Sequence, residues 1–122
     1  MADIILYGLA PSVCDTVKKA KKWLEAQEHS FTLHDYRKDG IDAQMIDTFL
    51  QYLPWQQVVN KRGTTYRQLS DEQKAQLDEH TARTLLLEYP AMIKRPILVV
   101  DGQYHLGFKL DQYQTIFATA AE

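Results

Sequence analysis

The chain has 122 residues, of which 45% are hydrophobic and 25% are charged, so it suits one globular domain and is too short for two independent ones. Its formal net charge of -2, from 14 basic and 16 acidic residues, argues against nucleic acid or an anionic membrane as a partner. One cysteine cannot form an internal disulfide, and the short apolar run after Asp3 resembles neither a signal peptide nor a membrane span, so we expect a cytoplasmic protein.

The first third of the chain alternates between strand and helix patterns. Residues 4–7 form a short apolar run that ends at Gly8, which is typical of a buried strand. Apolar side chains then recur at helical spacing over residues 15–27, and lysines occupy the other face of that helix. An alternating run over residues 31–36 predicts a second strand, which ends before Gly40. Strand, helix and strand in about 35 residues predict a right-handed βαβ unit with parallel strands.

The middle of the chain changes to a helical pattern. Apolar side chains at helical spacing predict a helix over residues 45–53, and Pro54 is expected to open a short helical piece that extends to Val59. Residues 60–67 form a polar loop in this prediction. Residues 70–73 have the form of a capping box and therefore predict the start of another helix. A last helix in this block is expected from about Thr81 to a point before Pro90.

Strand character returns near the C-terminus. Residues 97–100 are apolar, and Asp101-Gly102 predicts a tight hairpin into a strand over residues 103–106. A final helix is expected over residues 110–120. The order βαβ, helices, ββα predicts an α/β fold with a mixed sheet and a helical insertion over about residues 41–89. The insertion has no Pro/Gly/Ser-rich linker, so we expect it to pack against the sheet within one domain.

Cys14 stands between the first predicted strand and the first predicted helix. A thiolate there would be stabilised by the unpaired N–H groups and the dipole of the helix, which is the chemistry of a nucleophile. The alternative is that Cys14 is a small buried hydrophobe. Of its neighbours, Asp15 would oppose a thiolate and Lys18 would favour it. Because Val17 stands where a Cys-x-x-Cys pair would have its second cysteine, any catalytic cycle requires an outside thiol.

Other site types have little support. The four histidines have no metal-ligand spacing with one another or with Cys14, so no zinc site is predicted. They are His29, His34, His80 and His105. The sequence also lacks a phosphate-cradling glycine motif, and no tightly bound cofactor is expected. The aromatic residues Tyr7, Trp23, Tyr36 and Trp55 are interpreted as core or rim residues.

Five blocks of sequence, which span nearly the whole chain, carry a resemblance to a known family. They are Tyr7-Gly8, Cys14-Asp15-Thr16, His34-Asp35-Tyr36-Arg37-Lys38-Asp39-Gly40, Asn60-Lys61-Arg62-Gly63-Thr64-Thr65-Tyr66-Arg67 and Lys94-Arg95-Pro96-Ile97. On these blocks the chain resembles the arsenate reductase-related (ArsC/Spx) family, and within it the small YffB-like branch. The resemblance implies a thioredoxin-like fold in which the cysteine after the first strand is the reactive thiol.

The resemblance also implies a set of residues around Cys14. It implies that Pro96 is a cis-proline facing the cysteine, whereas sequence alone favours an ordinary trans proline. It implies that Arg95 lies close to Cys14, where a guanidinium would stabilise a thiolate and bind an oxyanion or carboxylate through two parallel hydrogen bonds. Arg62 lies in a Gly- and Thr-containing loop whose N–H and hydroxyl groups suit an anion, although such loops also serve as plain connections.

The chain departs from the arsenate-reducing members in its arginines. Those members use several arginines around the cysteine. The position of the first of these arginines corresponds most closely to Asn60 in this chain, and Arg62 follows two residues later. The last falls in Gly107-Phe108-Lys109, where there is no arginine. Lys109 supplies a positive charge but cannot donate the two parallel hydrogen bonds of an arginine guanidinium. We therefore do not expect arsenate to be the substrate.

Two functions remain open. The first is a glutathione-dependent thiol oxidoreductase in which Cys14 attacks a small oxidised or anionic substrate and Arg95 stabilises the thiolate. Glutathione is the expected co-substrate, because its carboxylates could bind arginines and lysines. Its expected contacts are Asn60, Arg62, Pro96 and Lys109. The second is a non-catalytic adaptor that binds a protein partner, as the Spx-type relatives do on RNA polymerase; the missing resolving cysteine and the incomplete arginine set motivate it.

Overall fold

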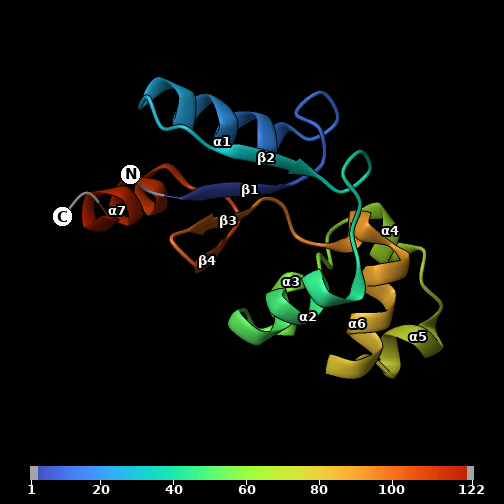
Figure 1. Cartoon of the computed structure of the whole chain (residues 1–122). Helices are drawn as coiled ribbons and strands as arrows, with labels where there is room; N and C mark the ends of the chain where they lie inside the picture. The colour runs from blue at the N-terminus through green and yellow to red at the C-terminus, as the bar shows by residue number, and fades with distance from the viewer. Residues whose placement is uncertain (1–2, 121–122) are drawn as a thin grey trace. The chain divides into compact units, whose positions relative to one another are not determined.

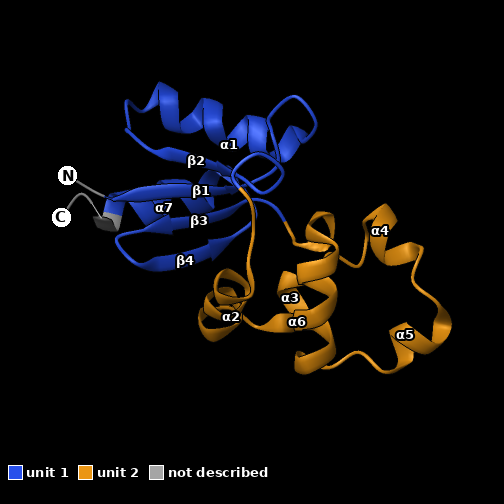
Figure 2. Ribbon diagram, turned by 45° about the vertical axis from the view of Figure 1, so that its right-hand side comes forward, with its two compact units in different colours: residues 1–39, 95–122 blue, residues 40–94 orange. Residues whose placement is uncertain are grey.

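The computed structural model describes residues 3–120 (Figure 1). In chain order the elements are β1 (Ile4–Gly8), α1 (Asp15–Ala26), β2 (Thr32–Asp35), α2 (Ala43–Tyr52), α3 (Trp55–Val58), α4 (Thr64–Arg67), α5 (Asp71–Ala75), α6 (Glu79–Glu88), the 3-10 helix η1 (Pro90–Met92), β3 (Ile97–Val100), β4 (Gln103–Leu106) and α7 (Leu110–Ala120). They form two compact units (Figure 2). The sheet unit comprises residues 1–39 and 95–122, and the helical unit comprises residues 40–94.

The sheet unit contains one four-stranded mixed sheet with the strand order β2-β1-β3-β4. β1 and β2 are parallel, whereas the pairs β1–β3 and β3–β4 are antiparallel. Leu6 of β1 pairs with Leu33 of β2 and with Leu98 of β3, which in turn pairs with His105 of β4. The predicted βαβ unit, the C-terminal ββα arrangement and the mixed α/β sheet are therefore confirmed.

The β3–β4 hairpin forms where Asp101-Gly102 predicted it. Asp101 has φ 50° and Gly102 has φ 83°, and a two-residue hairpin turn with both central residues at positive φ favours this Asp-Gly pair. The turn is also tied to the start of β1. The Asp101 N–H donates to the Asp3 carbonyl oxygen at 2.9 Å, and the Asp3 N–H donates to the Asp101 carboxylate at 2.7 Å.

An aromatic cluster joins α1 and α7 in the core of the sheet unit. Trp23 of α1 meets Tyr113 of α7 edge to face, with ring centroids 5.6 Å apart, and lies 5.4 Å from the ring of Phe117. Phe108, just before α7, also meets Tyr113 edge to face at 4.6 Å. The apolar positions that predicted these two helices therefore pack against each other.

Replacing Tyr113 by phenylalanine should leave the protein as stable as the wild type or more stable by about 1 kcal/mol. Tyr113 is fully buried, and its hydroxyl has no hydrogen-bond partner among the described protein atoms. Burial also raises the pKa of Tyr113. Tyr113→Phe keeps the ring contacts and removes the buried polar group. Urea denaturation measures the difference; a loss of more than about 1 kcal/mol would show instead that the hydroxyl makes a stabilising hydrogen bond.

The helical unit confirms the predicted capping box and shifts the start of α6. Ser70 accepts a hydrogen bond from the Gln73 N–H at 3.1 Å, and the Gln73 side chain accepts one from the Ser70 N–H at 2.9 Å. α6 begins at Glu79, two residues before the expected Thr81. The reason is a second capping box, in which Asp78 and Thr81 each accept the other's N–H at 2.8 Å. Thr81 therefore lies inside the helix that it was expected to begin.

Two further details of the helical unit differ from expectation. α4 occupies residues 64–67, which were predicted to be loop, and Pro54 precedes α3 as its N-cap instead of starting the helix. The unit also extends to residue 94, because the Asn60 N–H donates to the Met92 carbonyl at 2.8 Å and the Lys94 N–H donates to the Val58 carbonyl at 2.7 Å. These bonds tie the segment after α6 back to the end of α3. Of the helices in residues 3–120, none has the length and apolar character needed to cross a membrane.

Candidate functional site

Cys14 occupies the N-cap of α1, as its predicted place between strand and helix requires. Its N–H donates to the Ala10 carbonyl at 3.1 Å, and its carbonyl accepts from the Lys18 N–H at 3.0 Å. The Cys14 side chain makes no capping hydrogen bond. Only 8% of Cys14 is exposed, whereas 60% of the adjacent Val13 is exposed. Cys14 thus lies where a helix dipole favours negative charge, and little of it is exposed to solvent.

Gly8, at the end of β1, allows three parts of the sheet unit to converge. A Cβ atom at Gly8 would lie 2.8 Å from Cγ2 of Val17, and 3.9 Å from both Cβ and Cγ of Arg95. The Gly8 carbonyl also accepts a hydrogen bond from the Tyr36 N–H at 2.9 Å. Gly8 therefore brings together the helix that Cys14 caps, the Arg95 side chain and the residue that follows β2.

The Arg95-Pro96 segment leads into β3 at this same end of the sheet. The peptide bond between the two residues is cis, as the family resemblance implied. Arg95 is half-buried and Pro96 is buried. The Pro96 carbonyl accepts a hydrogen bond from the Gly107 N–H at 2.8 Å, so the segment from Gly107 to Lys109 also begins here.

Lys109 is exposed, and its backbone is fixed by Gln112. The Lys109 N–H donates to the Gln112 side-chain oxygen at 3.2 Å, and the Gln112 side-chain amide donates to the Leu106 carbonyl at 3.1 Å. Six site residues were predicted from the sequence. Four of them therefore come from segments that meet at one end of the sheet unit, namely Cys14, Arg95, Pro96 and Lys109. Gln112, which orders the last of these segments, was not identified from the sequence.

Tyr36 is a residue of this region that sequence reasoning placed only among core or rim aromatics. It is buried, with 3% of its surface exposed. Its ring stacks on that of Tyr7 with centroids 6.4 Å apart. Burial raises the pKa of Tyr36 far above its usual value, Tyr7 raises it further, and the positive charge of Arg95 acts in the opposite direction. The signal available in the sequence was the predicted parallel pairing, which places the residues after β2 beside Gly8.

Asn60 and Arg62 belong to the helical unit. The Asn60 side-chain oxygen accepts a hydrogen bond from the Arg62 N–H at 3.2 Å, which fixes the start of this loop. A Cβ atom at Gly63 would lie 3.1 Å from the Asn60 amide nitrogen, so Gly63 allows this tight turn. Arg62 itself is exposed. The role of Asn60 and Arg62 beside Cys14 stays a prediction.

Similarity to known proteins decides the family. The model described as the ArsC family matches residues 10–116. This chain belongs to the ArsC family. A solved structure of a YffB protein is 43% identical, with a TM-score of 0.86 over 92% of this chain and 96% of that one. The expected family and its thioredoxin-like α/β fold are therefore confirmed.

Curated relatives of this ArsC-family chain carry two kinds of description. An uncharacterised protein of Haemophilus influenzae is 44% identical over 115 residues, which cover 94% of this chain and 99% of the relative. The global transcriptional regulator Spx of Lactiplantibacillus plantarum is 26% identical over 112 residues, which cover 89% of this chain and 82% of the relative. Similarity therefore supports an arsenate reductase-like fold with regulators among its homologues.

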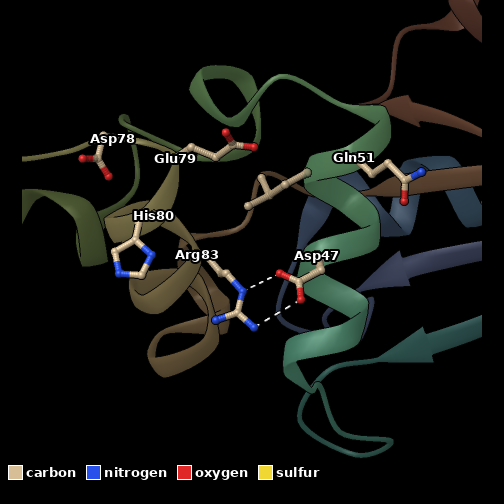
Figure 3. A pocket seen from close by; sticks show the side chains of 7 residues that line it. Asp47, Gln51, Asp78, Glu79, His80 and Arg83 are labelled. Atoms are coloured by element: carbon tan, nitrogen blue, oxygen red, sulfur yellow. Dashed lines mark hydrogen bonds and ion pairs between the residues drawn. The ribbon is translucent and has the colours of Figure 1, made fainter.

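A pocket of about 590 Å³ lies in the helical unit (Figure 3). Its lining residues are Asp47, Leu50, Gln51, Asp78, Glu79, His80 and Arg83. The Arg83 guanidinium donates to both carboxylate oxygens of Asp47, with the Nη2–Oδ2 bond at 3.2 Å. None of the six predicted site residues lines this pocket, so it gives no support to the predicted site. Among residues 3–120, no three His, Cys, Asp or Glu side chains are grouped so that they could hold a metal ion.

Asp47→Asn should destabilise this ArsC-family protein slightly at neutral pH, and the difference should shrink in acid. Hydrogen bonds from Arg83 hold the pKa of the Asp47 carboxyl below its usual value. The ion pair therefore stabilises the fold above the unfolded-state pKa, and this contribution is lost as the pH falls through the folded-state pKa. Thermal melts of both proteins between pH 7 and pH 3 measure the difference. A difference in melting temperature that changes with neither pH nor 1 M salt would contradict the ion pair as its cause.

Proposed function

We propose that this ArsC-family protein is a monothiol oxidoreductase that uses glutathione as its co-substrate. The observation that carries the proposal is the lone Cys14 at the N-cap of α1, together with the approach of Arg95 to Gly8 from the segment before β3. A helix N-terminus and a nearby guanidinium both favour a thiolate over a thiol. Cys14 and Arg95 are then the catalytic residues.

The proposed reaction is a pair of thiol–disulfide exchanges. The Cys14 thiolate attacks the glutathione sulfur of a mixed disulfide between glutathione and a small substrate, and the substrate leaves as its thiolate. Cys14 is then disulfide-bonded to glutathione. Because Val17 stands where a second cysteine would be, a second glutathione thiolate attacks this bond. Cys14 is released as thiolate, and glutathione disulfide forms from the glutathione of the mixed disulfide and the one that attacks, so each turnover reduces one substrate sulfur and oxidises one free glutathione.

Charged groups of this chain suit the carboxylates of glutathione. Arg95 can bind a carboxylate through two parallel hydrogen bonds, and exposed Lys109, two residues after the Gly107 that bonds Pro96, adds a positive charge. Asn60 and Arg62 belong to the helical unit, and their contact with glutathione stays a prediction from the sequence. Arsenate is not the proposed substrate, because Gly107-Phe108-Lys109 contains no arginine. The cytoplasm, where thiols are kept reduced, is the proposed location.

The test is to incubate the purified protein with glutathione disulfide at neutral pH and to measure its intact mass. One glutathione should be added to the wild-type protein, and excess reduced glutathione should remove it. Cys14→Ser should gain no mass. A wild-type Cys14 that stays unmodified would overturn the proposal, and an adduct that reduced glutathione does not remove would exclude turnover.

A second candidate function is an adaptor for a protein partner. The 8% exposure of Cys14 and the similarity to a transcriptional regulator favour it. An adaptor should recover one stoichiometric partner in affinity purification, and Cys14→Ser should recover the same partner. If neither protein retains a partner, or if only the wild-type protein does so through a disulfide, the adaptor function is contradicted.

A further inference from the structure

We propose that the pocket in the helical unit binds an aliphatic polyamine (Figure 3). Its volume of about 590 Å³ lies within the range of about 300 to 1,000 Å³ that is usual for small-molecule sites. All seven lining residues belong to the helical unit, and none of them is a predicted residue of the Cys14 site. The proposal is therefore independent of the proposed thiol chemistry.

Acidic side chains outnumber basic ones in the lining of the pocket. Asp47, Asp78 and Glu79 contribute three carboxylates. Arg83 contributes one guanidinium, so the lining has a formal net charge of -2 when His80 is neutral. The N-terminus of α6 opposes this charge with about half a positive charge, which is too little to reverse its sign. The pocket therefore favours a cationic ligand.

The two groups of the pocket that suit an anion are already engaged. The Arg83 guanidinium donates to both carboxylate oxygens of Asp47. The N-terminus of α6 is closed by its capping box, in which the Thr81 N–H donates to the Asp78 carboxylate at 2.8 Å. An anionic ligand would have to displace one of these two carboxylates, so the contacts inside the pocket also disfavour an anion.

The remaining polar groups are spread along the pocket. Glu79 begins α6, whereas Gln51 belongs to α2, and the Glu79 carboxylate has no hydrogen bond or ion pair with a described residue. Figure 3 shows both side chains toward the top of the view, above the Asp47–Arg83 ion pair. Within residues 3–120, no three His, Cys, Asp or Glu side chains are grouped to hold a metal ion. Spaced acceptors suit a ligand with several separate ammonium groups better than one compact cation.

Leu50 supplies an apolar part of the lining and is half-buried. Methylene groups gain free energy when they lie against an apolar surface, and charged chains bury their methylene stems in this way while their ammonium groups stay polar. A polyamine joins its ammonium groups by short methylene chains. It can therefore place one ammonium group at Glu79 and another near Gln51 while its methylenes contact Leu50.

The experiment is an NMR titration of the full-length, ¹⁵N-labelled protein with spermidine at low salt. Amide resonances around Gln51 and Glu79 should shift and saturate. Glu79→Gln should weaken binding by about twofold to fivefold, the effect of one exposed ion pair. Glu88→Gln is the matched control, because Glu88 lies on the same helix, is exposed and does not line the pocket. It removes the same charge and should bind spermidine as the wild type does.

Three results would overturn the proposal. Equal weakening by Glu79→Gln and Glu88→Gln, or shifts that do not saturate, would show a general attraction to an acidic surface. Shifts of the same resonances by inorganic phosphate at equal ionic strength would show that the pocket takes an anion. Tighter binding of a peptide with a single lysine at these residues would show that the ammonium group comes from a protein and not from a free polyamine.

Discussion

Gly8→Ala should lower the free energy of unfolding by about 1–3 kcal/mol, the usual cost of overpacking a core. The added Cβ would lie 2.8 Å from Cγ2 of Val17. Val17 is fully buried on α1 and β-branched, so its side chain cannot move aside freely. Either α1 or its contact with β1 must shift. Urea denaturation of Gly8→Ala and the wild type measures the loss.

The matched control removes the atom that clashes. In a Val17→Ala background, Gly8→Ala should cost less than about 0.5 kcal/mol, although Val17→Ala itself destabilises the core. The coupling between the two changes is what identifies the contact. Equal costs of Gly8→Ala in the two backgrounds would contradict the packing of α1 on the end of β1.

Arg95→Gln should slow the reaction of Cys14 with glutathione disulfide by about tenfold or more at neutral pH, the loss expected when a charged hydrogen-bond donor is removed. Glutamine keeps a long polar side chain at this half-buried position but removes the charge. Stopped-flow or quenched measurements of the rate of mixed-disulfide formation give the effect directly.

Lys94→Gln is the control for Arg95→Gln. Lys94 precedes Arg95 in the chain and is exposed, so this change removes the same net charge from a solvated side chain. It should alter the rate by less than about twofold, because an exposed charge is screened by solvent and salt. Equal slowing by Lys94→Gln and Arg95→Gln would show that net charge, and not the placement of Arg95, governs the reaction.

Local signals in the sequence predicted the fold well. The apolar run before Gly8, the Asp101-Gly102 turn and the Ser70 capping box each depend on neighbours in the chain, and each element formed where it was expected. The cis bond before Pro96 was implied only by the family blocks, since local preference favours trans.

Long-range features could not be predicted in the same way. The burial of Cys14, of which only 8% is exposed, has no local pattern in the sequence that reports it. Tyr36 and Arg95 are far apart in the chain, and both approach Gly8 only because β1 pairs with β2 on one side and with β3 on the other. The Asp78 capping box was missed because Thr81, its second member, was taken as the start of the helix.

The central claim, that Cys14 is a nucleophile, is tested most directly by the rate of its alkylation at pH 7 in the wild-type protein. Cys14 is the only cysteine, so the rate reports this thiol alone. The proposed site predicts that Cys14 is alkylated at pH 7 at least about tenfold faster than free glutathione, because the α1 N-terminus and Arg95 favour the thiolate. A rate at pH 7 no faster than that of glutathione would contradict the proposal and leave Cys14 as a small buried hydrophobe.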